Sequence, residues 1–159
     1  MNNHPREGKQ TMKRLSLVAA LLVLCLFGPH AQAQNKPTEG PVWRISLYKV
    51  KPGKLSDVLM NWRQNWRVIN EEMKRQGLIV DYRVYANPTA NGPDDWDLAT
   101  AIAYKNWAAF DGLGEKADAI TLKHYGSREK RQQAVEELDQ MRQLVSSRLM
   151  EELTLTPLQ

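Results

Sequence analysis

Residues 42–73 decide the fold of this chain. They read VWRISLYKVKPGK (42–54), followed by LSDVLMNWRQNWRVINEEM (55–73). The first segment alternates between a large apolar face and a more polar face, as a strand does, and Pro52 and Gly53 end it. Its apolar face holds Trp43, Ile45 and Leu47, and its polar face holds Arg44, Ser46 and Tyr48. In the second segment apolar residues recur every three or four positions, which predicts an amphipathic helix that ends at Gly77.

The rest of the chain adds three strands and two helices. Strand patterns cover 79–86 and 96–104, and a loop of turn-forming residues joins them. A helix is expected from Asn106 to about Lys123, a third helix from Ser127 as far as Val145, and a last strand over 149–155. This order predicts an α+β, ferredoxin-like βαββαβ fold. Its four-stranded antiparallel sheet carries helices on one face only, with an extra helix before the last strand.

Residues 12–33, MKRLSLVAALLVLCLFGPHAQA, have the three-part pattern of a secretory signal peptide. Two basic residues precede an apolar run, and Ala31-Gln32-Ala33 is a small-x-small cleavage site. The run, 15–27, is shorter than the roughly 20 residues that a membrane-spanning helix needs. We therefore expect cleavage after Ala33, export to the periplasm or the medium, and no stable membrane anchor. Residues 1–33 are then an extension with a signal peptide, 34–41 a flexible leader, and 42–159 a single domain.

The basic charge of the sequence belongs mostly to this first segment. The chain has 22 Lys and Arg against 18 Asp and Glu, a net charge of +4, and residues 1–33 carry four of the basic residues and one acidic residue. The remainder carries only +1, which gives no electrostatic reason to expect a nucleic-acid partner. Cys25, the only cysteine, lies in the apolar run, so the domain has no thiol chemistry and no disulfide.

A resemblance to a known superfamily rests on the same segments. The first strand runs into KPGK (51–54), the helix carries Trp62 and Trp66, the strand pair leads into YKNWAAF (104–110), and RLM (148–150) belongs to the last strand. Over 42–158 the sequence resembles the dimeric α/β-barrel superfamily, in which two ferredoxin-like subunits pack sheet against sheet. It also looks like a group of exported, functionally uncharacterised proteins. The resemblance implies a homodimer but no particular reaction, because the superfamily includes monooxygenases, haem-dependent enzymes, isomerases and proteins without known activity.

The sheet face that the helices leave open is the predicted site. We expect charges of both signs and two tyrosines there, which could line a ligand chamber or pair across a dimer interface. An arginine on this face would favour an anionic or carbonyl-bearing small molecule. The candidate residues are Arg44, Tyr48, Asp81, Arg83, Tyr85, Asp97 and Arg148.

Other chemistry has weaker support in the sequence. His124, the only histidine of 34–159, is a weak candidate for a haem ligand or a general base, and a surface histidine at a helix end is the alternative. The acidic run DDWD (94–97) matches no calcium loop and is typical of a solvated loop. Trp62 and Trp66 are expected to pack in the core rather than to form an aromatic ligand box. We therefore expect neither a metal nor a cofactor.

These patterns, together with the resemblance, imply an exported, homodimeric α/β-barrel protein that binds a small organic molecule in or near the sheet-face chamber, or that has a non-catalytic role in the cell envelope. One alternative is a cofactor-independent monooxygenase or isomerase that acts on an aromatic or polyketide-like substrate in the same chamber. Another is a non-catalytic interaction module whose sheet face only makes the dimer. The sequence leaves open whether the protein is an enzyme.

Overall fold

The computed structural model describes residues 38–92 and 95–155. They belong to the second of the two units into which the chain divides, Lys36–Gln159. The predicted signal peptide and the first part of the predicted leader, 34–37, lie outside the described residues. Within the described part, none of the helices combines the length and the apolar character that crossing a membrane requires.

The described elements follow the predicted order of strands and helices. The strands are β1 (Thr38–Val50), β2 (Asp81–Ala86), β3 (Leu98–Tyr104) and β4 (Arg142–Thr154). The helices are α2 (Leu55–Asn61), the π-helical turn η2 (Trp62–Trp66), α3 (Arg67–Arg75), the 3-10 turn η3 (Trp107–Phe110), α4 (Leu113–Tyr125) and α5 (Arg128–Asp139).

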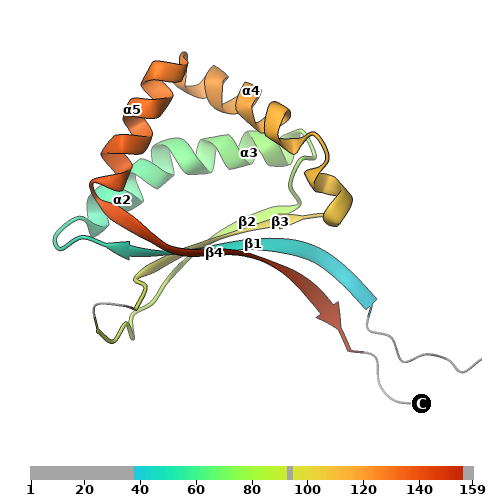
Figure 1. Cartoon of the computed structure of the whole chain (residues 1–159), viewed down its shortest axis with the longest axis horizontal. Helices are drawn as coiled ribbons and strands as arrows, with labels where there is room; N and C mark the ends of the chain where they lie inside the picture. The colour runs from blue at the N-terminus through green and yellow to red at the C-terminus, as the bar shows by residue number, and fades with distance from the viewer. Residues whose placement is uncertain (1–37, 93–94, 156–159) are drawn as a thin grey trace, which may run out of the picture. The chain divides into compact units, whose positions relative to one another are not determined.

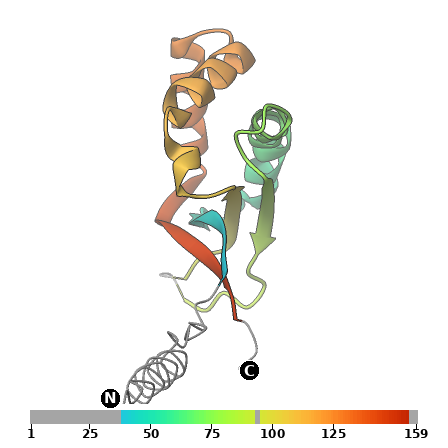
Figure 2. The same cartoon turned by 90° about the vertical axis from the view of Figure 1, so that its right-hand side faces the viewer.

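The four strands form one antiparallel sheet in the order β2-β3-β1-β4. Figure 1 shows the helices α2 to α5 together on one side of this sheet, and the view turned by 90° in Figure 2 shows the same one-sided layer. No described element covers the opposite face, which we call the open face. The sheet order and the single helix layer confirm the predicted α+β, ferredoxin-like fold.

Two clusters of buried side chains join the helices to the sheet. The larger cluster holds Met73, Ile79, Tyr104, Leu113 and Ile120. The smaller cluster holds Val58, Trp62 and Leu98, with Tyr48 and Trp66 packed against it. Since both clusters include residues at even-numbered positions of the strands, the even-numbered side of β3 and of β1 faces the helices.

The π-helical turn η2 keeps two tryptophans directed toward the sheet. Inward-facing positions follow one another in steps of four, from Val58 to Trp62, Trp66 and Asn70. An α-helix has only 3.6 residues per turn, so repeated steps of four would rotate these side chains away from the sheet. The π turn absorbs the extra residue, with the N–H of Arg67 donating to the Trp62 carbonyl five positions earlier. The prediction of one continuous amphipathic helix is therefore refined to two α-helical segments joined by a π turn.

β1 begins at Thr38 rather than at the predicted Val42. Its first residue pairs with Thr154 at the end of β4, and a register irregularity absorbs the Gly-Pro pair that follows. A Cβ on Gly40 would lie 2.9 Å from the carbonyl oxygen of Glu152, so only glycine lets the two strands approach this closely. The prediction of a flexible leader was therefore wrong for its second half, which belongs to the sheet.

β4 begins at Arg142, seven residues earlier than predicted, and α5 already ends at Asp139. Leu138, Met141 and Val145 have the spacing of a helix, although only Leu138 lies in α5. Met141 packs against the smaller core cluster just before the strand starts. Val145 lies at a bulge, where the pairing of β4 with β1 shifts by one residue. The predicted helical pattern as far as Val145 was thus wrong.

The helix predicted from Asn106 is interrupted after one short turn. η3 ends at Phe110, and α4 starts only at Leu113. Gly112 between them has φ +66°, a left-handed conformation that glycine adopts without steric cost. The prediction of one helix from Asn106 to about Lys123 is therefore corrected to two elements, η3 and α4.

Candidate functional site: a trough on the open sheet face

The open face carries the odd-numbered residues of β1, contrary to the prediction. Tyr48 packs against the smaller core cluster under the helices. The strand registers place Ile45, Ala101 and Arg83 in one row across the sheet, and these lie on the opposite face. The placement of Arg44 and Tyr48 on the open face was therefore wrong, because one residue of difference moves every side chain of a strand to the other side.

The polar residues of β1 have partners on the helix-covered side. The Ser46 hydroxyl shares a 2.9 Å hydrogen bond with the Ser147 hydroxyl. The guanidinium of Arg44 lies 5.3 Å from the ring centroid of Tyr104 and 5.7 Å from that of Phe110, within the range of cation–π attraction. These contacts explain how the more polar half of the strand can face the helix layer while the large apolar half faces outward.

The open face is hollowed along β3 into a trough of about 350 Å³. Its floor is formed by Ala99 and Ala101, whose side chains end at Cβ and are only 3% and 2% exposed between taller neighbours. The walls are Trp43, Ile45 and Leu47 from β1, Arg83 and Tyr85 from β2, and Trp96 just before β3. A concave, mostly apolar surface with a few polar groups is the usual form of a small-molecule site.

Among the described residues that line the trough, Arg83 is the only charged one. Its guanidinium lies 5.5 Å from the ring centroid of Trp43, and its Nε donates to Asp81 at 3.2 Å. Hydrogen bonds with Tyr85 and Asp81 raise the pKa of Arg83 above its ordinary value, so this residue stays cationic. An arginine has five N–H donors, and those not used here can bind a carboxylate or a carbonyl oxygen.

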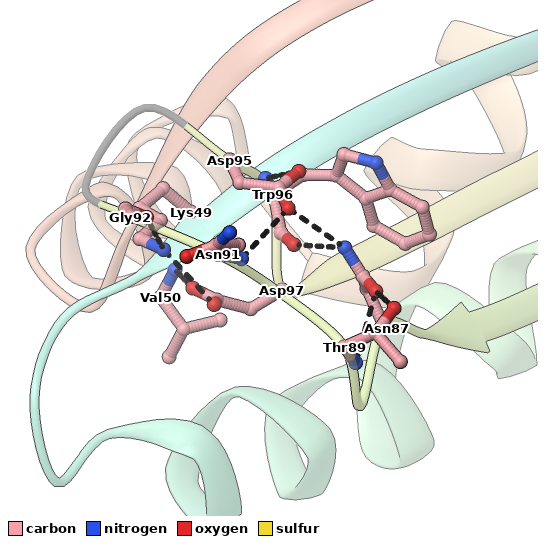
Figure 3. Close-up of polar contacts among 9 residues, drawn as sticks. All are labelled: Lys49, Val50, Asn87, Thr89, Asn91, Gly92, Asp95, Trp96 and Asp97. Carbon is pink, nitrogen blue, oxygen red and sulfur yellow. Dashed lines mark hydrogen bonds and ion pairs between the residues drawn. The ribbon is translucent and has the colours of Figure 1, made fainter.

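Asp97 anchors the end of the trough rather than lining it. Figure 3 shows its carboxylate between two donors, the Lys49 ammonium at 3.1 Å and the Val50 backbone N–H at 2.7 Å. Lys49 also donates to the carbonyl of Gly92 at 3.2 Å. The loop that enters β3 is thereby tied to the end of β1, which fixes the position of the neighbouring Trp96 wall.

Asp95 holds the same loop from within. Its carboxylate accepts the backbone N–H groups of Asn91 at 3.0 Å and Trp96 at 2.8 Å, as Figure 3 shows. These two hydrogen bonds keep the pKa of Asp95 below its ordinary value. Asn87 adds a side-chain hydrogen bond to the Trp96 carbonyl at 3.0 Å. The carboxylates of Asp95 and Asp97, in the described part of the acidic run, therefore stabilise the loop through hydrogen bonds.

The structure brings together only part of the predicted site. Arg83 and Tyr85 line the trough. Asp81 and Arg148 lie on the open face, because they pair in register with Ala103 and Ile45. They do not belong to the residues that line the trough. Asp81 is bound to Lys74 at 3.0 Å.

Sequence reasoning missed most of the trough walls and its floor. The missed residues are Trp43, Ile45, Leu47, Trp96, Ala99 and Ala101. A usable signal was present in LATAIAY (98–104), where alanines alternate with larger residues. Alternate small residues on one side of a central strand leave space on that side.

His124 lies on the helix layer, outside the trough. Its Nε2 is 2.9 Å from Oδ1 of Asn65, and its ring lines a separate hollow of about 360 Å³ together with Val68 of α3 and Ile120 of α4. Across residues 38–92 and 95–155, no group of three or more His, Cys, Asp or Glu side chains is arranged to hold a metal ion.

Comparisons with known proteins identify no family for this chain. No family model matches the sequence, and no curated protein matches it. The crystal structure of HapK from Hahella chejuensis is 18% identical with a TM-score of 0.45, and the match covers 70% of this chain and 92% of HapK. A dimeric protein of unknown function and ferredoxin-like fold from Bacteroides fragilis is 16% identical with a TM-score of 0.38, covering 72% of this chain and 96% of that one. The ferredoxin-like description of this chain rests on its own sheet order.

Proposed function

We propose that this protein is a homodimer whose two open sheet faces pack together, and that the trough so enclosed binds a small organic molecule. The ligand would have a planar, largely apolar body and a carboxylate or carbonyl group within reach of Arg83. The observation that carries this proposal is the alanine-floored trough of about 350 Å³ on a sheet face that no described element covers.

A second copy of the chain suits this face for two reasons. Trp43, Ile45 and Leu47 form an apolar row on its central part, and removing such surface from water is favourable by about 25 cal/mol per Å². Asp81 and Arg148 lie on the two edge strands of the same face, with opposite charges. A two-fold arrangement of two sheets would allow the carboxylate of one copy to meet a guanidinium of the other.

Filling the trough is expected to weaken ligand binding without unfolding the protein. Anthraquinone-2-carboxylate, a planar carbonyl compound with one negative charge, serves as the probe. We expect it to shift the indole N–H signals of Trp43 and Trp96 in NMR spectra of the protein. Ala101→Leu places a larger side chain on the floor of the trough. The affinity of this variant for the probe, measured by calorimetry, should therefore be at least about tenfold lower than that of the wild type. Ala119→Leu, on the exposed side of α4, should bind as the wild type does.

Arg83→Gln separates a ligand chamber from a pairing interface. A chamber loses affinity for the probe and stays folded and dimeric, whereas a pairing interface dissociates or loses stability because a partner charge is left unpaired. The ligand proposal fails if Ala101→Leu binds the probe as tightly as the wild type, or if neither Trp43 nor Trp96 responds. The alternatives of a monooxygenase or isomerase and of a pure interaction module stay predictions.

We also propose that the protein is exported, on the strength of the signal-peptide pattern of 12–33. In a Gram-negative host, mass spectrometry of the periplasmic fraction and the medium should find a chain that begins at Gln34. Leu21→Arg, which breaks the apolar run, should keep the uncleaved chain in the cytoplasm. Recovery of the wild-type protein from the cytoplasm with residues 1–33 intact would contradict export.

A further inference from the structure

We infer that the protein has a second small-molecule site, which takes an aromatic carboxylate, in a groove between η2 and β2 on the helix side of the sheet. The groove has a volume of about 240 Å³ and is lined by Trp62, Arg63, Trp66, Arg67, Tyr82 and Val84. None of its lining residues belongs to the trough. This inference therefore stands apart from the proposed function of the open face.

Three aromatic rings, together with Leu59 and Val84, form the apolar part of the groove. The ring centroids of Trp62 and Trp66 lie 6.2 Å apart, and Trp66 meets Tyr82 edge to face at 5.3 Å with an angle of 81°. The π turn is what keeps both tryptophans on this side of the helix, and π turns inside α-helices often occur at functional sites. Trp62 is only 4% exposed, so Trp66 and Tyr82, which are partly exposed, offer most of the aromatic surface to which a planar ligand can pack.

Tyr82 contributes no negative charge to the groove. Its hydroxyl donates to the carboxylate of Glu71 on α3. Burial, together with this hydrogen bond, raises the pKa of Tyr82 to about 12. The phenol is therefore neutral at physiological pH. The Glu71 carboxylate lies beside the groove, and the charged residues that line it are Arg63 and Arg67.

Arg63 and Arg67 supply two cations one turn apart on the same helix. Among the described residues neither of them forms an ion pair, and Arg67 Nε donates only to the carbonyl of Arg63 at 3.3 Å. The next cations along the same helix are all paired: Lys74 with Asp81 at 3.0 Å and Arg75 with Glu72 at 2.5 Å. Like charges four positions apart repel each other, and an anion bound between them removes that repulsion.

The chemistry of the groove selects the class of ligand. Guanidinium groups bind carboxylates through paired, charge-assisted hydrogen bonds. The flat faces of the aromatic rings offer no hydrogen bonds to a small hydrated anion, and they favour a flat ring system. A one- or two-ring arene that carries one carboxylate meets both conditions within the volume of the groove.

The test uses 2-naphthoate and the full chain with labelled tryptophans. We expect saturable binding that shifts the indole N–H signals of Trp62 and Trp66, with any shift at Trp43 and Trp96 reporting separate occupancy of the trough. Arg63→Gln and Arg67→Gln should each weaken binding by about tenfold in calorimetry, the usual cost of one charge-assisted contact. The neutral isostere 2-naphthamide should bind the wild type more weakly by a similar factor.

Arg128→Gln is the matched control, because Arg128 is an exposed arginine of α5 outside the groove and its loss changes the net charge equally. An equal loss of affinity in this variant would overturn the inference, since net charge alone would then explain binding. Absence of saturable binding, shifts at Trp43 and Trp96 alone, or equal affinity for 2-naphthamide would each overturn it as well. The comparison of the two probes needs no variant and so does not depend on how the variants fold.

Discussion

Trp62→Ala is expected to lower the free energy of unfolding by about 3–5 kcal/mol. Trp62 is only 4% exposed, packs with Val58 and Leu98, and meets the Tyr48 ring edge to face at 5.3 Å. It therefore joins the first helix to the centre of the sheet. Single domains unfold with about 5–15 kcal/mol in total, so the variant should be marginally stable. Urea titration followed by circular dichroism measures the difference.

Trp107→Ala is the control for the same chemical change. Trp107 is 50% exposed, and its indole N–H donates to Glu151 at 3.0 Å. Removing a half-exposed ring and one surface hydrogen bond should cost about 1 kcal/mol or less. Equal losses in the two variants would contradict the view that Trp62 is the side chain that fixes the helix to the sheet.

Ile45→Asp is expected to convert the proposed dimer into a monomer. Ile45 lies in the middle of the apolar row on β1, between Trp43 and Leu47. In the proposed dimer a carboxylate at this position would be buried against the partner's sheet, and its desolvation, at a cost of several kcal/mol, should outweigh the attraction of Arg148 beside it on β4. Light scattering after gel filtration at micromolar concentration should give a dimer mass for the wild type and half that mass for the variant.

Val135→Asp makes the same kind of substitution on the opposite layer. Val135 is 45% exposed on α5, so an added charge there stays in water and the dimer should persist. A wild-type protein that is monomeric at micromolar concentration would contradict the dimer. So would an Ile45→Asp variant that stays dimeric.

The order of the elements was predictable from the sequence because it depends on local patterns. The alternation in 42–50 and the repeat of apolar residues after Leu55 are properties of neighbouring residues. The same holds for the turn at Pro52 and Gly53. Once seven elements in this order are known, few arrangements remain, and the ferredoxin-like sheet is one of them.

Which face of β1 meets the helices was not predictable from the same patterns. Both sides of this strand carry apolar residues, with Val42 and Val50 on one side and Trp43 and Leu47 on the other. The choice depends on contacts with residues far away in the sequence. Arg44, for example, lies under the helices within reach of the Tyr104 and Phe110 rings, which are about 60 residues away in the sequence.

The trough was not predictable from the sequence for a related reason. Its floor comes from β3 and its walls from β1 and β2, and only the strand registers bring Ile45, Ala101 and Arg83 into one row. The predicted site contained Arg83 and Tyr85 because polar and aromatic residues attract attention in a sequence. Alanines do not, although here they create the space.

The alanine floor lets the capacity of the trough vary independently of the sheet that carries it. The hydrogen bonds between β3 and its neighbours use backbone groups alone, so they persist with any side chain other than proline at 99 or 101. Replacing one alanine by valine or leucine would shorten the longest molecule that fits, and glycine would deepen the hollow. Two positions on a single strand thus act as a size filter that mutation can adjust in steps of one or a few carbon atoms.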